Sequence, residues 1–194
     1  YGKDLDADVN LCNAVAEACS DARIKRVRLG SIDVPMLNYE VVYKLSQISE
    51  LCPHFHISLQ SGSDTVLKRM RRRYTTKEYF ETVQRIRSAF RDATITTDVI
   101  VGFPGETDDE FKETLDFCRE VCFQKIHVFP YSRREGTEAA AMSGQVPSYI
   151  KNARASELQK LSDMLSCEGA ASFIGKMGEV LIERQHEGSM TGYT

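Results

Sequence analysis

The sequence predicts an α/β fold built from parallel βα units. Short β-rich runs alternate with stretches whose apolar residues recur at helical spacing, and the connections are long enough for right-handed crossovers. The chain has 194 residues, of which 42% are hydrophobic and 27% charged, as in an ordinary globular protein. No apolar run approaches ~18 residues, so no membrane-spanning helix and no membrane partner are expected.

Turn and breaker residues mark the first two βα units. Residues 26–32 carry aliphatic side chains and include a Gly-Ser turn signal, which predicts a strand. Residues 38–49 follow with apolar side chains at helical spacing, and Pro53 is expected to end that helix. The second strand is expected at 54–59, and Ser63 is expected to cap the short helix that follows.

Two capping boxes mark the next two helices. In a capping box, a Ser or Thr side chain and a carboxylate three residues later satisfy free amides of the first helical turn. Thr75 forms such a pair with Glu78, and Thr107 forms one with Glu110. Each helix then presents an apolar face, formed by Tyr79, Val83, Ile86 and Phe90 in the first and by Phe111, Leu115, Cys118 and Cys122 in the second.

The remaining elements divide the chain into two parts. Further strands are predicted at 94–102 and 125–131, followed by a long helix from about residue 148 to 173. The pattern then changes, because residues 175–183 have the character of the opening strand of an all-β unit. We therefore expect a domain boundary near residue 174, with 1–174 and 175–194 as separate parts.

The cysteines and histidines receive no metal-binding role from their spacing. Six cysteines in this length are far too few for a disulfide scaffold, so reduced thiols and a cytoplasmic location are expected. An iron–sulfur cluster needs three or four converging thiolates, and no set here has suitable spacing. His54, His56 and His127 lie in predicted strands, where hydrogen-bonded histidines are more common than metal ligands.

The ends of the predicted strands carry the residues that a binding site needs. In parallel α/β folds, ligands bind at the carboxyl ends of the strands. These ends hold Gly30-Ser31, Gln60-Ser61-Gly62, residues 102–105 and residues 130–132. Ordinary turns need the same residue types, but four such ends around one rim favour a binding site.

Two charged features allow two interpretations each. Asp98 interrupts an apolar strand, where a carboxylate is costly unless it forms a salt bridge, such as with a neighbouring arginine, or faces a ligand. The basic run at 68–73 either caps a helix end as solvated cations or contacts RNA phosphates.

Four ordered motifs give the chain a family resemblance. Residues 54–75, 98–107 and 127–132, with Gly136-Thr137 after them, resemble the radical S-adenosylmethionine (SAM) methylthiotransferases. The resemblance covers residues 1–174 and implies a partial, open TIM-like radical SAM barrel. The tail, 175–194, is similar to the beginning of that family's small RNA-binding TRAM domain, here truncated.

The residues within these motifs favour one branch of that family. Gln60-Ser61-Gly62 resembles the tRNA-modifying members. Residues 29–32, 52–56 and 127–132 resemble the MtaB type, which acts on N6-threonylcarbamoyladenosine next to the tRNA anticodon. The MiaB type, which acts on isopentenyladenosine, and the ribosomal-protein type are the alternatives. Outside the family, two alternatives are a cluster-free barrel that binds RNA or a metabolite and a phosphate-binding barrel using residues 102–105. The acids at 108–110 would repel phosphate.

The resemblance also implies cofactors and partners. The family uses SAM and two 4Fe–4S clusters, and its Cys-x-x-x-Cys-x-x-Cys loop does not occur in these residues, so the cluster ligands are expected upstream of Tyr1. The chain would then be a fragment, inactive alone, of an enzyme that binds a tRNA anticodon stem-loop and a reductant protein. A missing first strand would expose a sheet edge and promote self-association.

Six residues are expected to contact SAM by this resemblance, and none is assigned a catalytic role. The polar ones would bind the methionine moiety, its carboxylate and the ribose, whereas the apolar pair would flank the adenine. They are Gln60, Ser61, Arg72, Asp98, Val128 and Phe129.

Overall fold

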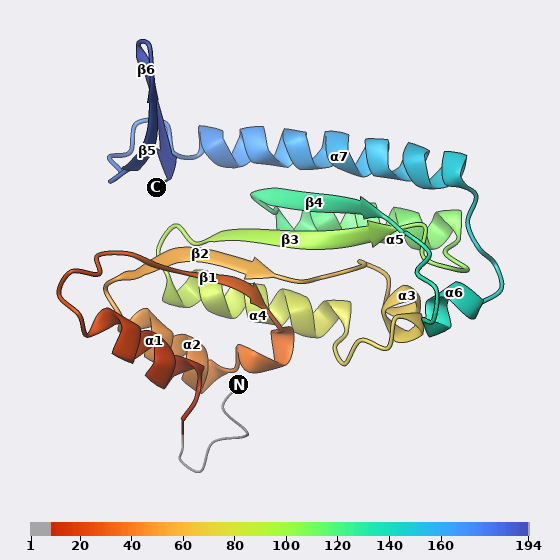
Figure 1. Cartoon of the computed structure of the whole chain (residues 1–194), viewed down its shortest axis with the longest axis horizontal. Helices are drawn as coiled ribbons and strands as arrows, with labels where there is room; N and C mark the ends of the chain where they lie inside the picture. The colour runs from red at the N-terminus through yellow and green to blue at the C-terminus, as the bar shows by residue number, and fades with distance from the viewer. Residues whose placement is uncertain (1–8, 194) are drawn as a thin grey trace.

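The computed structural model describes residues 9–193, and its centre is a parallel sheet. The strands are β1 (Val27–Ile32), β2 (Leu51–Ile57), β3 (Thr94–Val101) and β4 (Lys125–Pro130), and they lie in the order β1-β2-β3-β4 (Figure 1). Every neighbouring pair is parallel, so each connection is a crossover. The predicted α/β fold with parallel βα units is therefore confirmed.

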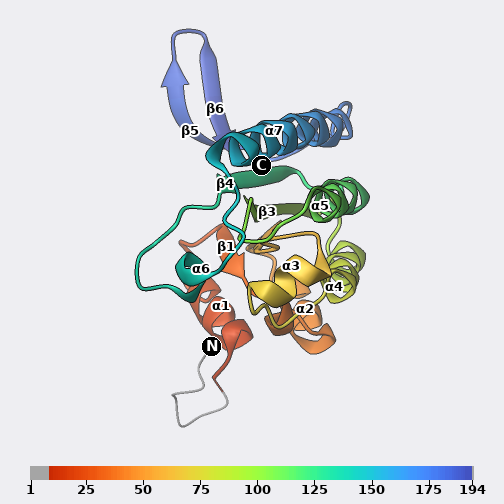
Figure 2. The ribbon, with the colours of Figure 1, turned by 90° about the vertical axis from the view of Figure 1, so that its right-hand side faces the viewer.

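The longer helices form a layer on one side of this sheet. They are α1 (Leu11–Cys19), α2 (Tyr39–Ser46), α4 (Thr76–Ala89), α5 (Asp108–Val121) and α7 (Ser148–Ala171). Figure 2 shows α2, α4 and α5 side by side next to the strands, and α7 packs against β4. The short helices η1 (Val34–Met36), α3 (Asp64–Arg69) and α6 (Glu138–Ala141) follow the carboxyl ends of strands.

Alternation along the strands gives the sheet two different faces. The side chains that point toward the helices are fully buried and form the core, as for Phe55, Val99 and Ile126. The opposite face, which we call the open face, is partly exposed and carries Arg28, His54, His56, Asp98, His127 and Phe129. One side of the sheet is therefore a packed core and the other is a polar surface.

Both predicted capping boxes are present. The Thr75 hydroxyl accepts from the Glu78 amide at 3.2 Å, and the Glu78 carboxylate accepts from the Thr75 amide at 2.7 Å. Thr107 and Glu110 form the same pair at the start of α5. Ser63, by contrast, precedes α3 but makes no cap, because its hydroxyl is hydrogen-bonded to the hydroxyl of Thr65 instead.

The second strand differs from the prediction because Pro53 lies inside it. β2 begins at Leu51, and the pairing shifts between Val27↔Leu51 and Leu29↔Phe55, so β2 has two more residues than β1 across this interval. Pro53 lies in that irregular interval, before the regular pairing with β3 begins at His54. A strand tolerates proline at such a bulge because the missing amide has no ladder partner there.

Two expectations near helix ends are also corrected. Cys122 does not join the buried face of α5, because it is the exposed C-cap residue with a left-handed backbone, φ 55°. At the other end of the chain, the strand expected at 175–183 begins later. An antiparallel hairpin of β5 (Leu181–His186) and β6 (Ser189–Tyr193) follows α7. Among the described residues, no helix is both long and apolar enough to cross a membrane.

Candidate functional site at the strand ends and open face

The turn after β2 has a strained backbone at Gln60. Its φ of 69° is a left-handed conformation that side chains other than glycine adopt rarely. The Gln60 amide donates to the carbonyl of Asp98 at 2.8 Å, and its carbonyl accepts from Ile100 at 2.9 Å, so the strain is held by β3. Backbone strain of this kind is concentrated at functional sites, which makes the turn a candidate binding element.

The Ser61-Gly62 part of this turn is attached to helix α5. The Thr114 hydroxyl accepts from the Gly62 amide at 3.1 Å and lies 3.3 Å from the Ser61 hydroxyl, which is fully buried. A Cβ atom at Gly62 would lie 2.7 Å from the Thr114 Cα, so only glycine fits. Ser61 therefore holds the turn in place, and its hydroxyl is directed into the protein.

An ion pair joins the same turn to the next one. Arg69, at the end of α3, donates to both carboxylate oxygens of Glu110, at 2.9 and 2.6 Å. The Thr65 hydroxyl donates to the same carboxylate at 2.6 Å. These bonds lower the pKa of Glu110 to about 2, chiefly through Arg69. Because Glu110 also closes the capping box of α5, this contact ties the β2 and β3 turns together.

The turn after β3 is fixed by a buried charge pair. Glu106 accepts from the Gly102 amide at 2.9 Å and from Arg154 of α7 at 2.8 Å, while Arg154 also reaches Asp108 at 2.7 Å. Burial raises the pKa of Glu106, although Arg154 and the Gly102 amide oppose this rise. Gly102 has φ 71° and lies directly against Lys151, so a side chain there would be both strained and obstructed.

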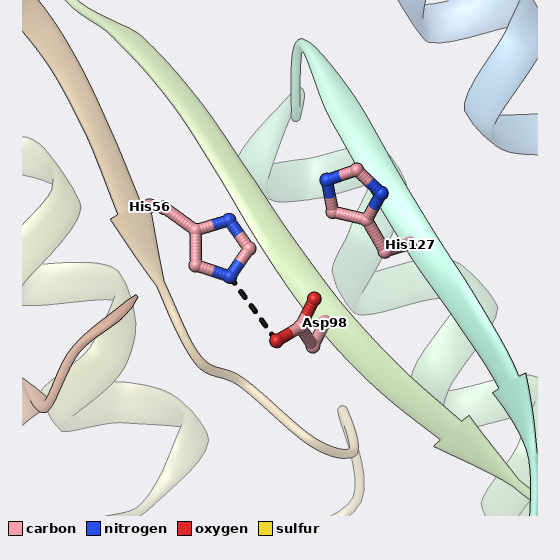
Figure 3. Close-up of side chains that lie close together, drawn as sticks. All are labelled: His56, Asp98 and His127. Carbon is pink, nitrogen blue, oxygen red and sulfur yellow. Dashed lines mark ion pairs between the residues drawn. The ribbon is translucent and has the colours of Figure 1, made fainter. Parts of the chain in front are cut away.

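Three polar side chains meet in the middle of the open face. His56 Nε2 lies 3.1 Å from Asp98 Oδ2 (Figure 3). One ring nitrogen of His127 lies within 4.8 Å of a ring nitrogen of His56 and of a carboxylate oxygen of Asp98. They come from β2, β3 and β4 respectively. Asp98 is therefore paired as expected, but its partner is a histidine rather than the arginine that the sequence suggests.

A fourth side chain, His54, extends this polar group along β2. Its Nδ1 lies 3.0 Å from the Thr94 hydroxyl. Burial, and secondarily the charge of Arg28, lowers the pKa of His54 to about 4, so its ring is neutral at physiological pH. His54 is thus the hydrogen-bonded, uncharged strand histidine that its position predicts.

The six predicted SAM contacts do not all point the same way. Asp98 and Phe129 lie on the open face, and Gln60 lies at its rim. Arg72 is exposed beyond α3, whereas Val128 packs toward the helix layer and Ser61 toward α5. The alternation of side chains along each strand could have placed His56 and His127 on the same face as Asp98, because each of the three lies between residues that point to the core.

The cysteines do not form a cluster site among the described residues. The only group of three or more His, Cys, Asp or Glu side chains with ligand atoms close enough for a metal, within residues 9–193, is His56, Asp98 and His127. Cys12, Cys52 and Cys118 are buried apart from one another in different elements, and the other cysteines are more exposed. These thiols therefore do not fit an iron–sulfur cluster.

Comparison with solved structures supports the fold. The chain resembles the coproporphyrinogen III oxidase HemN of Escherichia coli, described as a radical SAM enzyme, with a TM-score of 0.63 and 16% identity. The alignment covers 82% of this chain and 37% of that one. At this identity the similarity concerns the fold alone, and it agrees with an open barrel of parallel βα units.

Comparison with curated proteins gives closer relatives. The threonylcarbamoyladenosine tRNA methylthiotransferases MtaB of Bacillus subtilis and Thermotoga maritima are 41% and 42% identical over 100% of this chain. A tRNA-2-methylthio-N(6)-dimethylallyladenosine synthase of Thermoanaerobacter is 40% identical over 94% of it. The chain spans less than half the length of these relatives, 44%, 44% and 39% respectively.

A family match covers most of the sheet. The radical SAM superfamily model matches residues 3–118, which include β1, β2, β3 and the helices between them. This match contradicts the alternative hypothesis that the chain is an unrelated phosphate-binding barrel. Since more than half of its length matches, the chain belongs to the radical SAM superfamily.

Proposed function

We propose that this chain is the barrel portion of a tRNA methylthiotransferase that acts on N6-threonylcarbamoyladenosine. The observation that carries the proposal is the similarity along the whole chain to two MtaB proteins, at 41% and 42% identity. The MiaB-type reaction on isopentenyladenosine is the second candidate, because a relative of that type is 40% identical over 94% of the chain. The difference in identity is small, so the substrate base is the part that most needs an experiment.

SAM fits the chemistry of the strand ends. Phe129 presents an exposed aromatic ring suited to an adenine, and Asp98 presents a carboxylate suited to a ribose or an ammonium group. The Tyr131 hydroxyl, at the end of β4, is buried without a hydrogen-bond partner among the described residues. An unpaired polar atom there is costly unless a ligand satisfies it. We propose that these groups, with Gln60 at the rim, bind the cofactor.

The other predicted contacts have indirect or peripheral roles in this proposal. Arg72, whose side chain is exposed beyond α3, would contact the SAM carboxylate from the periphery of the site. Ser61 acts by fixing the turn that carries Gln60, since its hydroxyl is turned toward Thr114. Val128 supports Phe129 from the helix side of β4. SAM bound next to a reduced cluster would supply the radical chemistry; the chain's own residues bind and orient it.

The partners follow from the same proposal. The thiols of the described residues do not fit a cluster, so we propose that both 4Fe–4S clusters are held by a part of the parent protein outside them. The β5–β6 hairpin would begin a TRAM-like RNA-binding unit, so that 1–174 and 175–194 are separate domains. A tRNA anticodon stem-loop, a reductant protein and a cytoplasmic location complete the proposal.

Self-association is the further partner proposal. β1 has a neighbour on only one side in the described sheet, so its other edge carries unpaired backbone groups. Sedimentation velocity over a range of concentrations is expected to show a concentration-dependent dimer. A strictly monomeric chain at high concentration would contradict this.

The decisive experiment uses the parent protein that contains this chain. The reconstituted protein would be incubated anaerobically with SAM, a reductant and two tRNAs, one carrying N6-threonylcarbamoyladenosine and one carrying isopentenyladenosine. Mass spectrometry of the nucleosides is expected to find the 2-methylthio group on the first. Modification of the second alone would favour the MiaB type, and modification of neither would refute the proposal.

The cofactor site has a test of its own. Phe129→Ala is expected to weaken SAM binding at least tenfold by equilibrium dialysis in the parent protein, because adenine stacking is lost. Tyr149→Ala is the control, since Tyr149 is also an exposed aromatic residue but lies on α7. Equal affinities for the two variants would contradict the proposed adenine site.

A further inference from the structure

The side chains of His56, Asp98 and His127 are held together by the strand register. Asp98 and His127 are direct partners in the β3–β4 ladder, and His56 is paired with Thr96, two residues before Asp98. Residues two apart on one strand share a face, so all three side chains project from the open face. The sheet backbone, rather than a flexible loop, therefore brings the three groups to one place (Figure 3).

The spacing of their ligand atoms is close to that of a metal site. The three atoms, one from each side chain, lie within 4.8 Å of one another. In a tetrahedral site, two ligands at ~2.0–2.1 Å from a Zn²⁺ ion are about 3.4 Å apart. His56 Nε2 and Asp98 Oδ2, at 3.1 Å, are already close to this spacing. The distance to the His127 nitrogen would have to close by up to about 1.4 Å, and a rotation of the exposed His127 side chain can supply this movement.

Hydrogen bonds behind His56 determine which of its nitrogens faces Asp98. His56 Nδ1 lies 3.0 Å from the Thr96 hydroxyl, so Nε2 is the nitrogen directed at the carboxylate. Metal-binding histidines usually donate their other ring N–H to an oxygen, which fixes the ring and its tautomer. The Thr96 hydroxyl is placed to be that acceptor.

The same kind of contact orients both β2 histidines. The Thr94 hydroxyl lies 3.0 Å from His54 Nδ1, and the Thr96 hydroxyl lies 3.0 Å from His56 Nδ1. Two threonines of β3 therefore hold the two rings in place, so that His56 presents an already positioned nitrogen to the space beside Asp98.

We propose that His56, Asp98 and His127 bind a divalent transition-metal ion such as Zn²⁺ or Fe²⁺. Two imidazoles and one carboxylate are the ligand set of many zinc and non-haem iron sites. Asp98 is 27% exposed and His56 14%, so solvent or a ligand can complete the coordination from the open face. Asp98 also belongs to the SAM site proposed above, and one of its carboxylate oxygens remains for that contact; metal binding measured without SAM tests the ion alone.

Metal titration of the whole 194-residue chain tests this proposal without SAM or clusters. The exposed thiols would compete for the metal, so Cys122→Ser/Cys167→Ser serves as the background. Isothermal titration with Zn²⁺ is expected to show one equivalent bound. Co²⁺ is expected to give the absorption of a nitrogen–oxygen site without thiolate charge transfer.

Variants locate the ion. Asp98→Asn, which keeps the size of the side chain, and His127→Ala, which removes an exposed side chain of β4, are each expected to weaken Zn²⁺ binding at least tenfold. His186→Ala is the matched control, because His186 lies on the β5–β6 hairpin outside the group. Circular dichroism verifies that each variant is folded. The proposal is overturned if no equivalent binds, or if all three variants bind Zn²⁺ like the background protein.

Discussion

Replacing Glu110 by glutamine tests the contact that ties the β2 and β3 turns together. Glu110→Gln keeps the size of the side chain but removes its charge and one of its two acceptor oxygens. Arg69 donates to both oxygens, so at least one of its hydrogen bonds is lost. The expected result is a lower free energy of unfolding at neutral pH, because the guanidinium loses a paired anion.

The size of the effect follows from the pKa of Glu110. A fall from 4.5 to about 2 corresponds to about 3 kcal/mol, at about 1.4 kcal/mol for each pH unit. The Glu110 side chain is 13% exposed, but that of Arg69 is 33% exposed, so solvent screens part of the attraction. We therefore expect Glu110→Gln to cost about 2 kcal/mol.

The pH dependence has a definite sign. The pKa of Glu110 is lower in the folded chain than in the unfolded chain, so its contribution is fully present above pH 4.5 and is lost as the pH falls toward about 2. Urea unfolding of wild type and variant between pH 7 and pH 3 measures this. The difference between them is expected to shrink below pH 4.5.

A second ion pair on the same helix supplies the control. Asp116 pairs with Arg119 on α5, but its side chain is 59% exposed, so Asp116→Asn is expected to cost less than about 0.5 kcal/mol. A cost of Glu110→Gln at pH 7 no larger than that of Asp116→Asn would contradict the stabilising role of the Arg69–Glu110 pair. A wild-type advantage that stays constant down to pH 3 would contradict it equally.

Three further predictions concern the strand-end turns and the core. Gly62→Ala is expected to cost about 1–3 kcal/mol by urea unfolding, because its Cβ would lie 2.7 Å from the Thr114 Cα; an unchanged midpoint would contradict this. Arg154→Met is expected to cost about 3–5 kcal/mol by leaving Glu106 buried without its cation, and a loss below 1 kcal/mol would argue against it. Burial raises the pKa of Cys118 to about 12, so a thiol reagent at pH 8 is expected to modify it only after unfolding; rapid labelling in the native chain would show that the site is open.

The parts of the fold that depend on local patterns could be predicted from the sequence. Both capping boxes formed, because each needs only two residues at fixed spacing. The apolar faces of α4 and α5 were placed correctly except at Cys122, which ends its helix in a left-handed conformation. Periodicity alone does not show where a helix stops, so a residue at its end is easily assigned to the wrong side.

The parts that depend on pairing between strands could not be predicted in the same way. Pro53 is a breaker by its own chemistry, yet it lies inside β2 because a shift in the β1–β2 register leaves it without a required donor. The meeting of His56, Asp98 and His127 likewise depends on registers that join residues far apart in sequence. Asp98 was singled out as an unusual charge, but its partner was set by the ladder.

The attachment of the turns to the helices behind the sheet affects how the chain tolerates mutation. Thr114 holds the β2 turn from α5, and Arg154 holds the β3 turn from α7, although neither lies on the open face. A saturation-mutagenesis map scored by cofactor binding is therefore expected to show Thr114 and Arg154 as intolerant polar positions, in addition to the buried apolar positions of the two helices. Sequence drift in this layer would be restricted at these two positions, and a designer who grafts the strand ends onto another barrel would have to transfer both residues with them.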